Sequence, residues 1–314
     1  MLDSILDKSV VGYTRLGYRL RPHSAIDTDL SGRVAVITGA TSGLGRETAS
    51  ALARLGATVV LVGRNPDKTQ AVAEDIQQET SNPKVLPEIA DLSSMDEVRA
   101  LAARIEAPVH ILVNNAGVLL PERVETEDGF EKTFATNLLS HFLLTNLLIG
   151  KLEAPARIVN VSSGGMYTQR IRVDDLQMKH DRYDGAVAYA RTKRAQVILS
   201  ELWADALRGC GVVVHSMHPG WADTPGVSAS LPRFYKLTKP LLRTPAQGAD
   251  TIVWLCASDE AGHSTGQFWH DRRPRPTHRL PGTKETEAER TALWEQLAEL
   301  SGWFGSVSDF GKPG

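Results

Sequence analysis

A short apolar run followed at once by a glycine-rich turn constrains the fold of this chain more than any other feature. Residues 34–38 read Val-Ala-Val-Ile-Thr, which predicts a buried strand. Residues 39–45 read Gly-Ala-Thr-Ser-Gly-Leu-Gly, and a helical pattern follows over residues 46–55. This order suits a dinucleotide pyrophosphate, because glycines admit close approach and the helix N-terminus presents N–H donors. The glycine spacing alone, Gly-x-x-x-Gly-x-Gly, is weak, so the prediction depends on the strand and helix around it.

Strand and helix patterns alternate through most of the remaining sequence, with no internal repeat and no break in composition. Further strands are predicted at residues 58–62, 85–89, 111–113, 157–161, 212–217 and 267–269. Helices are predicted at residues 67–79, 94–105, 129–149, 186–207, 244–257 and 285–300. The alternation predicts an α/β fold with a single Rossmann-type, doubly wound parallel sheet and helices on both faces. This domain would span residues 31–270, between an N-terminal arm (1–30) and a C-terminal connection with an amphipathic helix (271–314).

Composition narrows the function classes. The hydrophobic share of 42%, the charged share of 23% and the net charge of −2 are ordinary for a soluble protein and give no attraction to nucleic acid. Cys210 and Cys256 lie too far apart for a metal-binding pattern and suit a reducing compartment. The start lacks a secretory signal and no apolar run could span a bilayer, so we expect a cytoplasmic protein. The basic residues within 271–282 are interpreted as a solvated connection rather than a nucleic-acid site.

Gly63 and Arg64 follow the strand at 58–62, at the point where dinucleotide-binding folds select their cofactor. An acidic side chain there would hold a ribose 2′-hydroxyl, whereas an arginine can hold a 2′-phosphate. Because Gly63 stands where the acid would be expected, we predict a preference for NADP(H), with NAD(H) as the other candidate. The plain alternative is that Arg64 is a solvated loop residue.

Tyr189 and Lys193 lie four residues apart in a predicted helix, so both side chains are expected on one face. A free tyrosine has a pKa of about 10, and a nearby cation would lower it. The pair is therefore predicted to give and take a proton at a carbonyl or alcohol, although an exposed helix face would carry the same pattern by chance.

Small and amide residues, Asn114–Gly117, follow the end of the strand predicted at residues 111–113. Such residues are expected in a ligand crevice, but also in a loop whose side chains satisfy its own backbone.

Together these segments resemble the short-chain dehydrogenase/reductase family over about residues 32–270. The resemblance rests on Thr38–Gly45, Asp91-Leu92, Asn114–Gly117, Asn137, Ser162-Ser163, Tyr189-x-x-x-Lys193 and Pro219-Gly220. Three longer phrases, residues 161–166, 218–226 and 247–251, are similar to the retinol-dehydrogenase-like branch of the family.

The resemblance implies a role for each matching residue. Tyr189 would be the general acid or base, and Lys193 would lower its pKa and bind the nicotinamide ribose. Ser163, or failing that Ser162, would orient the substrate oxygen, and Asn137 would hold a water in a proton relay. The other residues expected to bind the cofactor are Gly39, Thr41, Ser42, Gly43, Leu44, Gly45, Arg64, Asp91, Leu92, Asn115, Ala116, Gly117, Pro219, Gly220 and Thr224.

The expected activity is hydride transfer between NADP(H) and a lipophilic carbonyl or alcohol. A dinucleotide-binding sensor or scaffold without turnover is the alternative. An apolar pocket wall is suggested by Pro225, Val227, Leu231, Phe234, Tyr235 and Leu237. The long, polar interval between Ser163 and Tyr189 could form another part of the pocket. Residues 1–20 could form a packed arm, a lid or a weak membrane-surface helix. The resemblance also suggests a homodimer through the helices of Asn137 and Tyr189.

Overall fold

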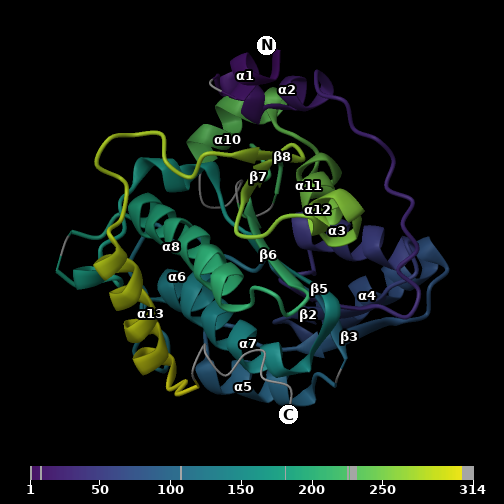
Figure 1. The fold of residues 1–314 in the computed structure, drawn as a ribbon, viewed down its shortest axis with the longest axis horizontal. Coiled ribbons are helices and arrows are strands. Elements are labelled where there is room, and N and C mark those ends of the chain that lie inside the picture. Colours follow the sequence, from purple (N-terminus) through teal and green to yellow (C-terminus); the bar gives the residue numbers. More distant parts are fainter. Residues whose placement is uncertain are drawn as a thin grey trace.

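The computed structural model describes residues 2–7, 9–106, 108–180, 182–224, 226 and 232–305. Within them, one eight-stranded sheet crosses the molecule in the order β3-β2-β1-β4-β5-β6-β7-β8 (Figure 1). Its strands are β1 (Val34–Thr38), β2 (Thr58–Gly63), β3 (Val85–Ile89), β4 (Val109–Asn114), β5 (Leu152–Val161), β6 (Val212–Met217), β7 (Phe268–His270) and β8 (Arg273–Arg275). Neighbouring strands pair in parallel from β3 to β7, whereas β8 is antiparallel to β7. The predicted doubly wound sheet is confirmed.

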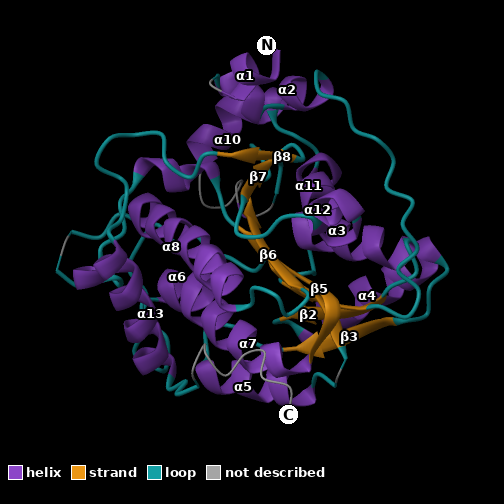
Figure 2. Cartoon of the chain, viewed as in Figure 1, coloured by secondary structure: helices purple, strands orange, loops and turns teal. Residues whose placement is uncertain are grey.

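Helices cover both faces of the sheet, as Figure 2 shows. One face carries α3 (Gly43–Arg54), α4 (Pro66–Thr80), α11 (Pro245–Ala257) and the short α12 (Asp259–Gly262). The other carries α5 (Met95–Arg104), α6 (Lys132–Phe134), α7 (Ser140–Leu148) and α8 (Gly185–Ala206), with α13 (Glu287–Ser301) outside them. One apolar core lies between the sheet and the helices on each face, so the strands are buried on both sides.

Aromatic side chains attach α13 to the outer surface of α7 and α8. The Phe142 ring lies 5.0 Å from Trp294 and 5.8 Å from Trp303, both edge-on, and Trp294 also meets Trp203 at 6.2 Å. Leu293 and Leu297 are fully buried in the same cluster. A dimer through this face of α7 and α8, as the resemblance suggested, would therefore have to displace α13.

Three segments differ from the sequence-based expectation. The helix expected at residues 129–149 begins at Lys132 and is interrupted by a π-helical turn, Ala135–Leu139, before α7. The stretch 221–243, expected to be irregular, contains the helix α10 (Pro232–Thr238). Residues 271–282, expected to be a solvated connection, include strand β8 and the nearly buried Arg275. This segment is not a solvated connection because Arg275 forms ion pairs with Asp3 and Asp7 of the N-terminal arm.

The N-terminal arm folds as α1 (Leu2–Asp7), a 3₁₀ turn (Val10–Tyr13) and α2 (Arg15–Arg19), and then runs as loop to β1. In Figure 1 the helices of the arm lie near α10, β7 and β8, at the end of the sheet away from β3. In the described part of the chain, no helix has both the length and the apolar character needed to cross a membrane.

Candidate active site

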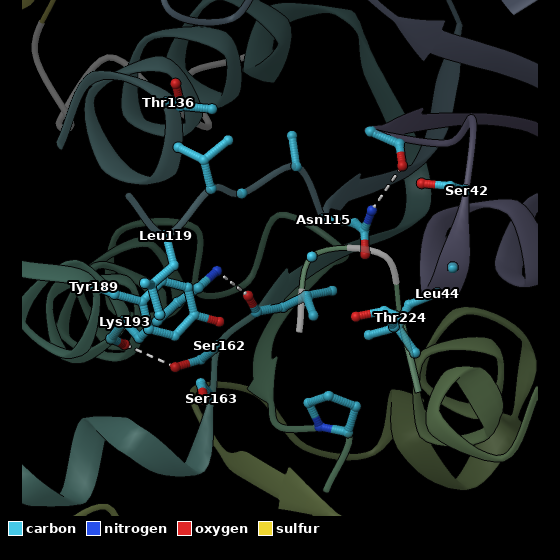
Figure 3. A pocket seen from close by; sticks show the side chains of 18 of the residues that line it. Ser42, Leu44, Asn115, Leu119, Thr136, Ser162, Ser163, Tyr189, Lys193 and Thr224 are labelled. Carbon is cyan, nitrogen blue, oxygen red and sulfur yellow. Dashed lines mark hydrogen bonds between the residues drawn. The ribbon is translucent and has the colours of Figure 1, made fainter. Parts of the chain in front are cut away.

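One cavity of about 770 Å³ opens at the carboxyl ends of β1 and β4. The chain leaves these two strands in opposite directions, to α3 on one face and toward α7 on the other, so a crevice forms between them. Figure 3 shows Ser42, Leu44 and Thr224 on one side of the cavity and Tyr189, Lys193 and Ser163 on the other. Its volume lies within the range of small-molecule and cofactor sites.

The turn after β1 is fixed by hydrogen bonds to the loop after β4. The Thr38 hydroxyl donates to the carbonyl of Val113 and accepts from the backbone N–H groups of Asn115 and Ala116. The Asn115 side chain donates to the carbonyls of Thr38, at 2.9 Å, and Gly39, at 3.2 Å. Asn115 lines the cavity, and its amide N–H groups hold the glycine turn. Its role in binding the cofactor stays a prediction.

Close backbone packing requires glycine at two positions of the glycine turn. Gly39 has a φ of +64°, and a Cβ there would lie 2.8 Å from Cα of Ala116. A Cβ at Gly45 would collide with the carbonyl of Gly39. Ser42 makes no capping hydrogen bond, and the first turn of α3 contains no acidic residue. The N-terminus of α3 thus faces the cavity with its positive dipole end, and the residues fit a dinucleotide phosphate.

Arg64 and Asp91 border the same cavity beyond β2 and β3. The Arg64 side chain is 66% exposed and its Nη1 lies 3.9 Å from a carboxylate oxygen of Asp91. Burial acts to raise the pKa of Asp91, but hydrogen bonds from Ser93 and the charge of Arg64 outweigh it, so this pKa is lowered. Asp91 is therefore ionised at neutral pH, and Arg64 retains an accessible guanidinium.

Tyr189, Ser163 and Lys193 meet at the other end of the cavity. Nζ of Lys193 lies 5.5 Å from the centre of the Tyr189 ring and donates to the carbonyl of Val161 at 2.7 Å. The Ser163 hydroxyl interacts with the Tyr189 phenol. In contrast, Ser162 is buried and donates to the carbonyl of Lys193 at 2.7 Å. The geometry thus places Ser163, rather than Ser162, beside the phenol.

The electrostatics of the Tyr–Lys pair differ from the expectation. Burial raises the pKa of Tyr189, and the hydrogen bond from Ser163 only partly opposes this. Burial also lowers the pKa of Lys193 to about 7. Lys193 therefore loses much of its charge near neutral pH, so the lowered tyrosine pKa predicted from the sequence is wrong for the protein without cofactor.

Asn137 and Gly45 are the predicted site residues that do not line the cavity. Asn137 is fully buried in the π-helical turn, a distortion that re-aims side chains and is frequent at functional sites. Its amide accepts from the N–H of Val118 at 2.8 Å and donates to that residue's carbonyl at 2.9 Å. The side chain thus fixes the segment after β4, and its role in holding a water stays a prediction.

The remaining cavity wall was only partly anticipated. Val118, Leu119 and Leu120 continue β4 into the cavity, and Trp221 and Ala222 follow the predicted Pro219-Gly220. Val118, Leu119 and Leu120 could have been predicted from the sequence, because they form an apolar run directly after Asn114–Gly117. Of the wall residues suggested from sequence, Pro225, Val227, Leu231 and the Phe234 side chain lie outside the described part of the structure.

A proton-donating phenol and a phosphate cradle that share one cavity define an oxidoreductase that uses a nicotinamide dinucleotide. Comparison with known proteins agrees: the family profile described as "short chain dehydrogenase" matches residues 33–232. The chain belongs to this family of NAD(P)(H)-dependent oxidoreductases.

The similarity extends beyond the profile. The chain is 40% identical to dehydrogenase/reductase SDR family member 12 of Bos taurus, covering 94% of this chain and 95% of that protein. It is 39% identical to retinol dehydrogenase 12 of Bos taurus, covering 88% of each. Among solved structures, 7α-hydroxysteroid dehydrogenase complexed with NADH and 7-oxo glycochenodeoxycholic acid matches with a TM-score of 0.64 and 25% identity, over 79% of this chain and 95% of that one.

The burial of Lys193 predicts an unusual pH dependence of stability. The unfolded lysine has a pKa of 10.5 and the folded one about 7. Between these two pH values the lysine is protonated in the unfolded chain but neutral in the folded chain, so the free energy of unfolding rises with pH. Below pH 7 the folded protein bears the full cost of burying the charged lysine. We expect Lys193→Met to be about 2 kcal/mol more stable than wild type near pH 6, after allowing for the lost hydrogen bond to Val161.

Urea unfolding of the cofactor-free protein from about pH 6 to pH 10.5 measures this difference, which should shrink as pH rises. Lys84→Met, at an exposed position, is the control and should show no such trend. A Lys193→Met variant less stable than wild type near pH 6 would contradict the assignment.

Proposed function

We propose that the protein transfers hydride between NADP(H) and a lipophilic carbonyl or alcohol. The observation that carries this proposal is the single cavity in which the glycine turn, Arg64 and the Tyr189–Ser163–Lys193 group meet. When bound, the nicotinamide dinucleotide supplies or accepts the hydride. Tyr189 gives its proton to the oxygen of a carbonyl substrate, or receives it from an alcohol, while the Ser163 hydroxyl orients that oxygen. Lys193, with a pKa of about 7, can exchange the proton near neutral pH.

Steric and electrostatic features at the end of β2 support a preference for NADP(H). A Cβ at Gly63 would collide with the side chains of Thr69 and Thr41, so an acidic residue cannot replace it in this conformation. The guanidinium of Arg64 is accessible at the cavity and only loosely paired with Asp91. A planar guanidinium suits a phosphate, whereas no acidic side chain at this position is available for a 2′-hydroxyl.

Arg64→Asp tests this preference. The change replaces an attractive charge with a repulsive one at a charge-assisted phosphate contact, so kcat/KM for NADPH relative to NADH should fall about thirtyfold. Steady-state kinetics with both cofactors measures the ratio. Arg208→Asp, at an exposed arginine that does not line the cavity, should leave the ratio unchanged. An unchanged ratio in Arg64→Asp would remove Arg64 from the cofactor site.

The substrate class is proposed from the apolar wall around the reactive end. Leu119 lines the cavity together with Tyr189 (Figure 3), and Val118, Leu120 and Trp221 extend the same lining. Burial of apolar substrate surface against such residues contributes roughly 25 cal/mol per Å². A retinoid, a steroid or a long aliphatic aldehyde would present that surface, and the similarity to a retinol dehydrogenase is consistent with such substrates.

Tyr189→Phe tests the proton transfer. Removing the phenolic hydroxyl should lower kcat about a thousandfold with lipophilic aldehydes and ketones, because the substrate oxygen loses its proton source. NADPH affinity, measured by fluorescence, should change little. Tyr183→Phe, whose hydroxyl bonds Glu131 away from the cavity, is the matched control. Full turnover by Tyr189→Phe would overturn the mechanism, and tight NADPH binding without turnover in wild type would favour a sensor.

We further propose that the protein associates with anionic membrane surfaces. The arm and the α10 region carry six exposed apolar side chains, and Arg15 of the arm contacts the carbonyl of Pro240. These side chains are Val10, Val11, Leu16, Leu20, Leu237 and Leu241. The exposed basic residues Arg19, Lys236 and Lys239 lie in the same two segments. Asp3 and Asp7 instead form ion pairs with Arg275, so this surface combines apolar and positive groups.

The double variant Leu16→Asp/Leu237→Asp should bind vesicles containing phosphatidylglycerol about tenfold more weakly than wild type, because it adds negative charge and removes apolar surface. Sedimentation with vesicles measures binding, and NADPH affinity should not change. Leu86→Asp, an exposed leucine in β3 at the opposite edge of the sheet, is the control. Equal sedimentation of the double variant and wild type would exclude this surface.

A further inference from the structure

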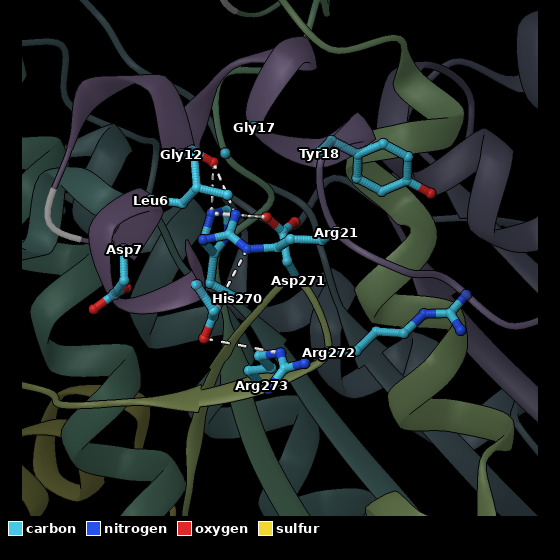
Figure 4. Close-up of polar contacts among 12 residues, drawn as sticks. Leu6, Asp7, Gly12, Gly17, Tyr18, Arg21, His270, Asp271, Arg272 and Arg273 are labelled. Carbon is cyan, nitrogen blue, oxygen red and sulfur yellow. Dashed lines mark hydrogen bonds and ion pairs between the residues drawn. The ribbon is translucent and has the colours of Figure 1, made fainter. Parts of the chain in front are cut away.

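The N-terminal arm is bound to the domain through a buried charge cluster. Asp271 is 4% exposed and pairs with Arg21, as Figure 4 shows. It also pairs with Arg243. The guanidinium of Arg243 donates to the Asp271 carboxylate at 2.5 Å and 2.9 Å. Both arginines also donate to the carbonyl of Gly12 in the arm. Removing one partner from such a buried network would leave an uncompensated charge, so the arm is held firmly.

Arg243 also connects the arm to the cavity wall. Its guanidinium donates to the carbonyl of Thr14 in the arm at 3.3 Å and to that of Pro219 in the wall at 3.1 Å. Its backbone N–H donates to the carbonyl of Trp221 at 2.7 Å. One buried side chain thus joins the arm to the segment that follows β6.

Tyr13 contacts the wall directly, from the side opposite the cavity. Its carbonyl accepts from the backbone N–H of Trp221 at 2.8 Å. Its ring stacks on His218 with centroids 5.1 Å apart. A Cβ on Gly164 would lie 2.8 Å from the ring, so the ring packs against the residue that follows Ser163. Tyr13 therefore supports two wall segments at once, the one with Ser163 and the one with Pro219-Gly220.

Close backbone packing fixes the position of the arm against the cavity wall. Gly220 has a φ of +75°, and a Cβ there would lie 2.6 Å from Nε of Arg243 and 2.8 Å from the carbonyl oxygen of Tyr13. Within the arm, a Cβ on Gly12 would collide with the carbonyl of Leu6, and one on Gly17 with that of Val11. The arm therefore has little freedom to move without moving the wall.

We propose that the arm is part of the active site and that Tyr13 is its positioning residue, setting the places of Ser163 and of the Pro219–Trp221 segment relative to Tyr189. This inference rests on the proposed reductase function for its kinetic consequences only. Tyr13 does not line the cavity, so it acts through His218, Trp221 and Gly164. Its hydroxyl is not required for these contacts, so a phenylalanine should replace it.

The test compares Tyr13→Ala with Tyr13→Phe and with Asp27→Ala, an exposed arm residue. Without cofactor, amide hydrogen exchange in residues 162–166 and 218–222 should be about tenfold faster in Tyr13→Ala and unchanged in the other two. Affinity for 2′,5′-ADP, which would occupy only the adenosine end, should stay within about twofold of wild type. The kcat should fall about tenfold to a hundredfold with KM for the carbonyl little changed, because the reacting groups are displaced.

Unchanged exchange in both segments of Tyr13→Ala would overturn the proposal. So would a loss of 2′,5′-ADP affinity in parallel with kcat, because that result would indicate general unfolding. If Tyr13→Ala does not fold, Tyr13→Leu, which retains apolar volume without the stacked ring, is judged by the same criteria. If wild type turns over no substrate, the reductase proposal fails, while exchange and fragment binding still decide the role of Tyr13.

Discussion

The divergence of the chain after β1 and β4, two strands that pair at the centre of the sheet, is the constraint on which the site depends. Parallel strands place all their carboxyl ends at one edge, and the crevice forms where the connections leave toward opposite faces. Thr38 and Asn115 hold the two strand ends together with buried hydrogen bonds. Because those bonds fix the glycine turn, the N-terminus of α3 points at the same cavity as Tyr189. Without that link, the phosphate cradle and the proton donor would not face one ligand.

At the end of the cavity that holds Tyr189 and Lys193, burial lowers the stability of the fold but gives a lysine pKa that suits proton transfer. Lys193 is almost fully buried and has a pKa of about 7, so the folded protein carries a cost that an apolar residue would not. Burial also raises the pKa of Tyr189. Functional sites commonly retain such destabilising groups, because a matched pKa near neutrality serves proton transfer better than stability.

Additions at both ends of the chain cover surfaces that the central sheet leaves open. At the C-terminus, α13 packs Leu293, Leu297 and Trp294 onto α7 and α8. At the N-terminus, ion pairs between Asp3 and Arg275 and the Asp271 cluster place the arm behind the cavity wall. The two additions differ in chemistry: the first buries apolar surface, whereas the second neutralises buried charges, so the position of the arm depends on specific partners.

The sequence alone determined the parallel sheet, the strand–turn–helix cradle and most of the cavity lining. Val34–Thr38, the glycine turn and the Tyr189–Lys193 spacing are local patterns, and local backbone geometry is sufficient to interpret them. The tertiary structure alone decided the raised pKa of Tyr189, the contact of the Ser163 hydroxyl with the Tyr189 phenol and the position of Tyr13 behind the wall. These depend on desolvation and on contacts between residues far apart in the chain, such as Tyr13 with Trp221 and Arg21 with Asp271. No periodicity or spacing encodes which distant groups will be buried together, because that is fixed only when the whole core packs.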